Sequence, residues 1–209
     1  MSERRAVLVT QRRDCVPDRP ETRDALEASW AECLWEAGWM PFPAVNVAAA
    51  AAAQFEALRP GLVLLTGGND APGTGQDRVP ARDETESVLM ALAARTGTPL
   101  LGVCRGAQML ALAAGMRLVR VESHVRVRHA LRGPLADAWR GPADVASFHH
   151  WGVEAGSIPE GWDIVARSED GVVEAFASAE RRSLGVLWHP EREPRHLPAV
   201  LEYMEASFL

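Results

Sequence analysis

The sequence contains 22 arginines and no lysine. This absence excludes Schiff-base chemistry, covalently held pyridoxal phosphate and the lysine of a phosphate-binding loop, because each requires a lysine amine. Cysteine is also scarce: Cys15, Cys33 and Cys104 are widely spaced and form no C-x-x-C pair. An odd number of isolated cysteines predicts free thiols in a reducing cytoplasm, without a disulfide framework or a cysteine zinc site.

Long apolar runs are absent too. The longest, Val47–Ala53, is far shorter than the roughly 20 residues of a membrane-spanning helix. Met1–Arg5 is charged and leads directly into a strand-like stretch, unlike a signal peptide. The net charge of −6 argues against nucleic acid as the main partner. We therefore expect no membrane, no nucleic acid and no targeting segment.

The first half of the chain alternates between apolar strand patterns and helical periodicity. Leu62–Thr66 is a continuous apolar run, which is typical of a parallel strand buried on both faces. We expect further strands at Ala6–Thr10, Met40–Val45 (at a sheet edge), Pro99–Val103 and Arg117–Val121, and helices at Glu21–Gly38, Ala48–Leu58, Arg82–Thr96 and Arg105–Ala114. This order predicts an α/β fold with a mostly parallel, twisted sheet flanked by helices.

After Glu122 the pattern changes to short strands separated by turns. We expect strands at Val145–Phe148, Asp163–Arg167, Val172–Ala177 and Ser183–Trp188, then a helix at Arg195–Leu209. Strands that follow one another in this way indicate antiparallel additions in the C-terminal half. No repeat or linker divides the 209 residues, of which 47% are hydrophobic, so we expect one domain over 1–209.

The segment Gly102-Val103-Cys104-Arg105-Gly106 joins a predicted strand to a predicted helix. It is the cysteine form of the G-x-S-x-G nucleophile elbow. A nucleophile on such a turn has strained dihedral angles, and side chains two positions away would collide, so glycines stand there. The helix N-terminus favours the thiolate, and the Arg105 N–H points toward a developing oxyanion. A buried structural cysteine is the alternative interpretation.

A cysteine nucleophile needs a base, and the sequence offers six histidines. Only His189 combines a position at a predicted strand end with a carboxylate at fixed reach, in Trp188-His189-Pro190-Glu191. Pro190 keeps His189 extended, and residues two apart in an extended segment point to the same side. Glu191 can therefore bind one imidazole nitrogen while the other faces Cys104. A surface turn without a catalytic role is the alternative.

These motifs resemble those of a known family. The elbow with Gln108 four residues after the cysteine, and the later W-H-P-E segment, are similar to class I glutamine amidotransferases, which have a flavodoxin-like fold. Leu65–Asp70 and Ser147–His150 resemble the γ-glutamyl hydrolase (peptidase C26-like) branch. Gln11–Trp30 and His124–His129 resemble, less specifically, hydrolases of γ-glutamyl-CDP-amidate.

The resemblance implies a role for each matching residue. Cys104 is the expected nucleophile, His189 the general base and acid, and Glu191 the group that orients His189. The N–H groups of Gly68 and Arg105 are the expected oxyanion hole. Gln108 is expected to help hold the glutamyl group, and the reaction needs no metal and no organic cofactor.

The remaining histidines and a group of arginines are candidates for substrate contact. His149 and His150 are assigned to substrate or core contacts, as are His124 and His129, because no cysteine or carboxylate spacing supports a metal site. Arg126 and Arg128, with Arg132 nearby, form either a solvated face or a phosphate clamp, since arginine binds phosphate in a bidentate manner.

Three functions remain in competition. The favoured one is a hydrolase that cleaves the γ-glutamyl amide of a small-molecule conjugate through a γ-glutamyl thioester and releases glutamate. The second is the glutaminase subunit of a two-chain amidotransferase, which delivers ammonia to a synthetase partner. The third is a non-catalytic binding module, against which the complete set of nucleophile, base and orienting group argues. The sequence predicts no oligomeric state.

Overall fold

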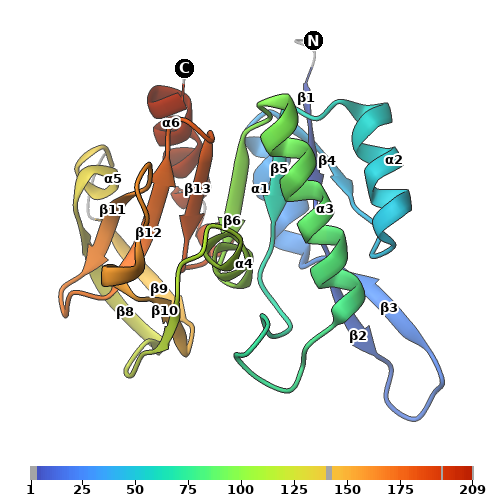
Figure 1. The fold of residues 1–209 in the computed structure, drawn as a ribbon, viewed down its shortest axis with the longest axis horizontal. Coiled ribbons are helices and arrows are strands. Elements are labelled where there is room, and N and C mark those ends of the chain that lie inside the picture. The colour runs from blue at the N-terminus through green and yellow to red at the C-terminus, as the bar shows by residue number, and fades with distance from the viewer. Residues whose placement is uncertain (1–3, 140–142, 194, 209) are drawn as a thin grey trace.

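The computed structural model describes residues 4–139, 143–193 and 195–208. An eleven-stranded sheet runs through the molecule in the order β4-β1-β5-β6-β13-β12-β11-β8-β9, with β10 attached to β12 and β7 to β10 (Figure 1). The parallel strands are β4 (Trp39–Pro43), β1 (Arg5–Val9), β5 (Leu62–Leu65), β6 (Leu100–Val103) and β13 (Ser183–Val186). The antiparallel strands are β12 (Val173–Ser178), β11 (Asp163–Ser168), β8 (Val125–Arg132), β9 (Asp144–Phe148), β10 (Trp151–Val153) and β7 (Leu118–Arg120).

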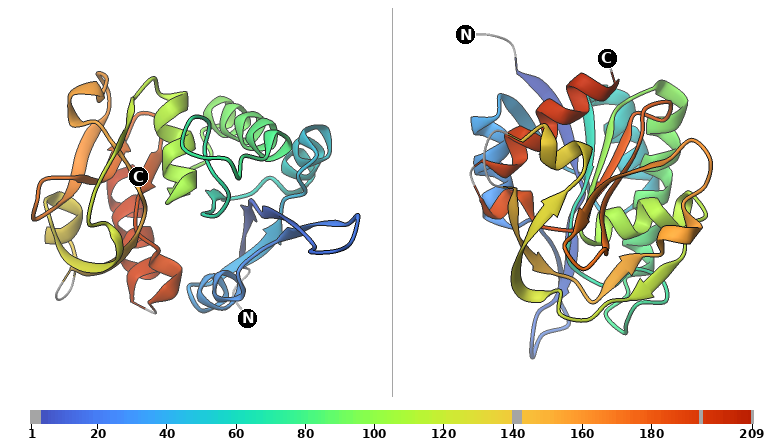
Figure 2. Two further views of the ribbon diagram at one scale, coloured as in Figure 1. Left: turned by 90° about the horizontal axis from the view of Figure 1, so that it is seen from below. Right: turned by 90° about the vertical axis from the view of Figure 1, so that its left-hand side faces the viewer.

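Helices cover both faces of the parallel strands, and Figure 2 (left) shows the two layers from below. α1 (Ala28–Glu36) and α6 (His196–Phe208) lie on one face, while α2 (Ala48–Leu58), α3 (Pro80–Thr96) and α4 (Arg105–Ala113) lie on the other. Alternate strand residues divide between the layers: Val7 and Val9 belong to the first core and Leu8 to the second. Burial on both faces explains why these strands are continuous apolar runs.

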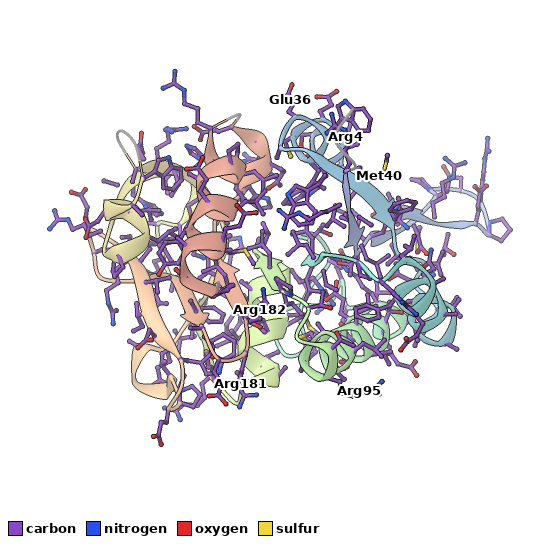
Figure 3. The ribbon with its side chains drawn as sticks, turned by 90° about the horizontal axis from the view of Figure 1, so that it is seen from above. Arg4, Glu36, Met40, Arg95, Arg181 and Arg182 are labelled. Carbon is purple, nitrogen blue, oxygen red and sulfur yellow. The ribbon has the colours of Figure 1, made fainter. Side chains whose placement is uncertain are left out.

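The α/β fold with a parallel sheet and antiparallel additions is confirmed. The sheet edge predicted near Met40 is also correct, because β4 pairs with β1 alone within the described residues. Figure 3 shows the Met40 side chain on the outer side of this strand, where it is 37% exposed. None of the described helices is both long and apolar enough to cross a membrane.

The helix predicted over Glu21–Gly38 begins too early. Its first residues form β3 (Thr22–Ala25), which pairs with β2 (Arg12–Cys15) in a hairpin that projects from the body (Figure 1). Arg13 Nε lies 2.8 Å from Asp24 Oδ1, and Asn46 Nδ2 donates to the same oxygen at 2.9 Å. These partners are distant in sequence, so local periodicity could not reveal them.

Two further differences concern the C-terminal half. The predicted strand at Ser183–Trp188 joins the parallel sheet as well as the antiparallel one, since β13 pairs parallel with β6 and antiparallel with β12. Two antiparallel strands, β8 and β10, and the short helix α5 (Pro134–Asp137) were not predicted. In β8 the valines at 125 and 127 alternate with arginines, a strand pattern obscured by the concentration of charge.

Candidate active site

Three neighbouring parallel strands carry the predicted site residues to one edge of the sheet. β6 lies between β5 and β13, and the three strands run in the same direction. Gly68 follows β5, Cys104 follows β6, and His189 follows β13. Ligand sites of open α/β sheets lie outside the carboxyl ends of such strands.

Cys104 has the backbone strain that an elbow requires. Its φ of 51° and ψ of −107° lie outside the regions that residues with a side chain normally occupy. A Cβ on Gly102 would lie 2.6 Å from Gly106 O, and one on Gly106 would overlap Leu65 O. Both glycines are therefore required for the close approach of β6, α4 and β5.

His189 lies between Cys104 and Glu191. Its Nδ1 is 2.7 Å from Glu191 Oε1, and both side chains are buried. The Cβ position that Gly67 lacks would be 2.9 Å from His189 Cε1 and 3.5 Å from Cys104 Cβ, so glycine leaves room for the imidazole. Burial alone would lower the pKa of His189, but the charge of Cys104 and hydrogen bonds with Cys104 and Glu191 raise it to about 10. His189 is therefore held as a cation beside the sulfur.

A cavity of about 350 Å³ opens over the sulfur. Its lining includes the predicted residues Gly68, Cys104, Arg105, Gln108, His149, His150 and His189, together with Asn69, Asp70, Thr74, Arg120, Phe148, Trp151 and Arg192. Gln108 Nε2 donates to Trp151 O at 3.0 Å, and this hydrogen bond joins α4 to β10. The Arg192 guanidinium lies over the Phe148 ring at 4.6 Å, and these two side chains form part of the wall beside His189.

A buried charge network supports the loop that carries Gly68, and sequence reasoning missed it. Arg82, which is 0% exposed, donates to Thr66 O at 2.8 Å, to Gly67 O at 3.0 Å and to Gly68 O. Its Nε also donates to Glu86 Oε1 at 2.9 Å. The i,i+4 spacing of Arg82 and Glu86 on α3 was the sequence feature that could have indicated this ion pair. Such pairs usually lie on exposed helix faces, so the spacing did not indicate burial.

Arg105 joins the same network from the elbow. It donates to Glu86 Oε2 through Nη1 and to Asp83 Oδ1 at 2.5 Å through Nη2. The residue whose N–H was assigned to the oxyanion hole is therefore fixed by its own side chain.

The arginines for which a solvated face or a phosphate clamp was expected lie away from the cavity, and two of them form exposed ion pairs. Arg128 is bound by Asp144 at 3.0 Å and by Glu193 at 2.8 Å, and hydrogen bonds with these two carboxylates raise its pKa. Arg132 pairs with Glu169 at 3.1 Å. Neither these arginines nor Arg126 is among the described residues that line the cavity. Besides Arg105, the cavity wall contains Arg120 and Arg192, which sequence reasoning passed over.

The histidines divide between two places. His150 is exposed and lines the cavity over Cys104. His149 also borders the cavity, but its Nε2 lies 3.4 Å from Glu174 Oε1. His124 and His129 approach the same Glu174 oxygen. Glu174 is 0% exposed and is the carboxylate that sequence spacing did not supply.

Comparison with known proteins identifies the family. Residues 10–191 match the Peptidase C26 family. GMP synthase (glutamine-hydrolysing) of Leifsonia xyli is 33% identical over 159 residues, which cover 72% of this chain and 30% of that protein. The small chain of carbamoyl phosphate synthase from Ruegeria pomeroyi is 34% identical over 150 residues, which cover 70% of this chain and 36% of that protein. The chain thus spans well under half the length of these relatives.

A solved structure supplies the fold comparison. A glutamine amidotransferase from Thermotoga maritima has a TM-score of 0.64 at 16% identity and covers 98% of this chain and 84% of its own. At that identity the likeness concerns the fold alone, while the family follows from the sequence matches. The chain belongs to the Peptidase C26 family and is similar to class I glutamine amidotransferases, relatives that indicate hydrolysis of a C–N bond.

Proposed function

We propose that the chain hydrolyses the γ-glutamyl amide bond with Cys104 as nucleophile, His189 as general acid and base, and Glu191 as orienting group. The observation that carries this proposal is that a strained cysteine elbow and a histidine paired with a buried glutamate meet at one cavity, which Cys104 and His189 line. A nucleophile, a base and a group that orients the base are the parts that acyl transfer requires.

The reaction has two halves. The Cys104 thiolate attacks the γ-carbonyl carbon, and protonated His189 gives its proton to the leaving nitrogen as the C–N bond breaks. A γ-glutamyl thioester remains on Cys104. His189, now neutral, takes a proton from water, whose oxygen attacks the thioester. Glutamate leaves, and the thiolate–imidazolium pair is restored.

The oxyanion forms beside two backbone N–H groups in this proposal. Gly68 and Arg105 line the cavity next to Cys104, and the network of Arg82 and Glu86 holds both segments. Preorganised donors stabilise developing charge because no reorganisation is needed as the reaction proceeds. In the same proposal Gln108, on the first turn of α4 and in the cavity lining, contacts the glutamyl group.

Glutamine is the proposed substrate, and a synthetase is the proposed recipient of the ammonia. This choice reverses the preference drawn from sequence and rests on the relatives, which are named as glutamine-hydrolysing GMP synthase and the small chain of carbamoyl phosphate synthase. We place the reaction in the reducing cytoplasm, which suits the free thiols Cys15, Cys33 and Cys104.

Hydrolysis of a γ-glutamyl conjugate is the second candidate. It is favoured by the match to a peptidase family and by a wall that carries Arg120 and Arg192 for a leaving group. The narrower assignment to γ-glutamyl-CDP-amidate loses one of its grounds, because Arg126 and Arg128, the candidate phosphate ligands, are not among the residues that line the cavity.

Steady-state assays of the purified chain on glutamine and on a γ-glutamyl anilide test both candidates. Slow glutamate release from both compounds, faster on addition of a synthetase, is expected for the amidotransferase glutaminase. A kcat/KM at least about tenfold higher on the anilide, or about 1.4 kcal/mol, would favour the conjugate hydrolase. Release that is unchanged in Cys104→Ala would contradict both candidates, and Cys15→Ala is the matched thiol control.

A further inference from the structure

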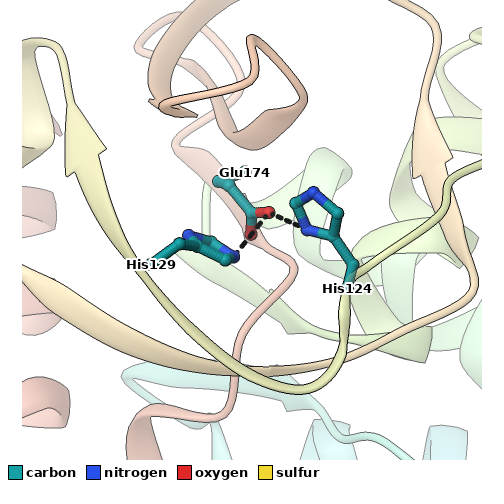
Figure 4. A group of neighbouring side chains, drawn as sticks. All are labelled: His124, His129 and Glu174. Atoms are coloured by element: carbon teal, nitrogen blue, oxygen red, sulfur yellow. Dashed lines mark ion pairs between the residues drawn. The ribbon is translucent and has the colours of Figure 1, made fainter.

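The antiparallel half of the sheet contains a buried cluster that the proposed reaction does not use. His124 precedes β8, His129 lies on β8, and Glu174 lies on β12 (Figure 4). His124 is 2% exposed and Glu174 is 0% exposed, while the His129 side chain is 12% exposed. His149, 2% exposed, adjoins them from the segment after β9.

The cluster converges on one carboxylate oxygen. Glu174 Oε1 lies 3.0 Å from His124 Nδ1, 3.3 Å from His129 Nε2 and 3.4 Å from His149 Nε2. Despite these short distances, none of the contacts has hydrogen-bond geometry. Among the described residues, His124 Nδ1, both ring nitrogens of His129 and His149, and both oxygens of Glu174 have no hydrogen-bond partner.

So many unpaired polar atoms in one buried place require an explanation. Each buried group without a partner costs about 1–3 kcal/mol, and native structures contain few of them. Ring nitrogens and carboxylate oxygens that are close together but have no hydrogen-bond alignment are expected where their lone pairs point toward a common centre. A cation at that point would satisfy several of them at once.

The distances from Glu174 Oε1 suit a small tetrahedral ion. Zinc binds imidazole nitrogen and carboxylate oxygen at about 2.0–2.2 Å, so adjacent ligand atoms of a tetrahedral site are about 3.3–3.5 Å apart. The distances of 3.3 Å and 3.4 Å from Glu174 Oε1 agree with this, and that of 3.0 Å is slightly shorter. The ligand atoms of His124, His129 and Glu174 all lie within 4.8 Å of one another.

The surroundings of His124 orient it as a ligand. Its Nε2 lies 3.0 Å from Asp170 Oδ2, and Asp170 in turn accepts a hydrogen bond from Ser168 Oγ. A proton on Nε2 donated to this carboxylate leaves the Nδ1 lone pair directed at the cluster, the arrangement of carboxylate–histidine–metal triads. The backbone is fixed as well, since His149 N donates to His124 O at 3.0 Å.

We propose that His124, His129 and Glu174 bind a divalent ion of the zinc class, with His149 beside the fourth position. Imidazole and carboxylate ligands in this number are typical of zinc and exclude calcium and magnesium as preferred ions. The ion ties β8 to β12 next to the segment His149–Trp151, which lines the cavity over Cys104. Its role is to hold that wall, and its ligands take no part in the chemistry at the sulfur.

The test uses the full chain carrying Cys104→Ala, so that the reactive thiol binds no zinc. After chelator treatment and addition of zinc chloride, elemental analysis after desalting should give one zinc per chain, and the melting temperature should rise. Cobalt(II) should bind with the visible spectrum of a tetrahedral site that has no thiolate ligand. No retained zinc and an unchanged melting temperature would overturn the proposal without any ligand variant.

Ligand variants in the same background identify the site. Glu174→Gln keeps the shape of the side chain and should lose the ion, as should the double variant of His124→Ala with His129→Ala. Asp170→Asn should weaken binding by about 10- to 100-fold. His150→Ala, which removes an exposed neighbouring histidine, should retain one zinc. Equal zinc in Glu174→Gln and the parent would show that the ion binds elsewhere and would overturn the assignment.

Discussion

Two fully buried glutamates, Glu86 and Glu174, lie among nitrogen-bearing side chains and differ in their partners. Glu86, on α3 beside the parallel half of the sheet, binds Arg82 through Oε1 and Arg105 through Oε2. Glu174, in the antiparallel half, faces His124, His129 and His149, and no described group forms a hydrogen bond with either of its oxygens.

The difference follows from the side chains themselves. Arginine is always charged and carries five donors in a fixed fork, so two arginines bind a buried carboxylate without help. A neutral imidazole has one donor and one acceptor. His124 faces Asp170 with Nε2 and Glu174 with Nδ1, so one of its nitrogens meets a carboxylate without a proton unless a second proton or a metal ion is present. The arginine cluster is therefore a support for the site, whereas the histidine cluster is suited to bind an ion.

The largest expected effect lies in the parallel half, at the sulfur. Cys104→Ala should lower kcat/KM by at least about 10³-fold, because removing the nucleophile of a catalytic set removes most of its effect. The fold should persist, as shown by an unchanged melting temperature. Iodoacetamide should label Cys104 ahead of Cys33, whose pKa burial raises to about 12. Full activity in the variant would remove Cys104 from the mechanism.

The next effect tests the arginine cluster as a support. Glu86→Gln leaves Arg82 and Arg105 without their buried counter-charge and should lower the free energy of unfolding by about 3–5 kcal/mol. Denaturant titration measures the change. Glu84→Gln, an exposed residue on the same helix, is the matched control and should change it by less than about 0.5 kcal/mol. Equal effects of the two substitutions would contradict the assigned role.

The pH profile tests the His–Glu pair. Since the pKa of His189 is raised to about 10, its proton should be present at neutral pH, and kcat/KM should fall as the pH rises through about 10. Glu191→Gln removes a charge and changes a hydrogen bond that both raise this pKa, so the alkaline limb should move to lower pH, with about tenfold lower activity at the optimum. An alkaline limb at the same pH in both proteins would show that Glu191 does not tune His189.

The smallest expected effect comes from comparing Arg192, which lines the cavity, with Arg128, one of the arginines considered for a phosphate clamp. Arg128→Ala should leave kcat/KM on γ-glutamyl substrates within about twofold of wild type, because Asp144 and Glu193 already occupy its guanidinium. Arg192→Ala should raise KM on a phosphorylated γ-glutamyl conjugate by about tenfold, or 1.4 kcal/mol. The reverse order of effects would restore the sequence-based clamp.

Local chemistry was predictable from the sequence. The requirement for glycine at 102 and 106 follows from the elbow alone. The contact between Glu191 and His189 was predicted, but the expected extended segment is wrong: Pro190–Arg192 form a 3-10 helix, and this turn brings Glu191 Oε1 to 2.7 Å from His189 Nδ1. Continuous apolar runs, separated by helical segments, likewise predicted the buried parallel strands, because a strand buried on both faces has no polar positions.

Long-range pairing was not predictable. The helix boundary near Glu21 was misplaced because Asp24 finds its partners in Arg13 and Asn46. Glu174 lies on a strand far along the chain from His124 and His129, so no spacing rule joins them. The arginines of β8 were considered as phosphate ligands because of their charge, and only the structure shows which carboxylates they bind.

The most direct test of the proposed chemistry is to trap the acyl-enzyme. Wild-type protein mixed with glutamine, quenched in acid and digested should give a peptide in which Cys104 carries a γ-glutamyl group, detected by mass spectrometry. Glu191→Gln should give the same adduct more slowly, and Cys104→Ala should give none. Turnover of glutamine without any adduct on Cys104, or an adduct that persists in Cys104→Ala, would contradict the account.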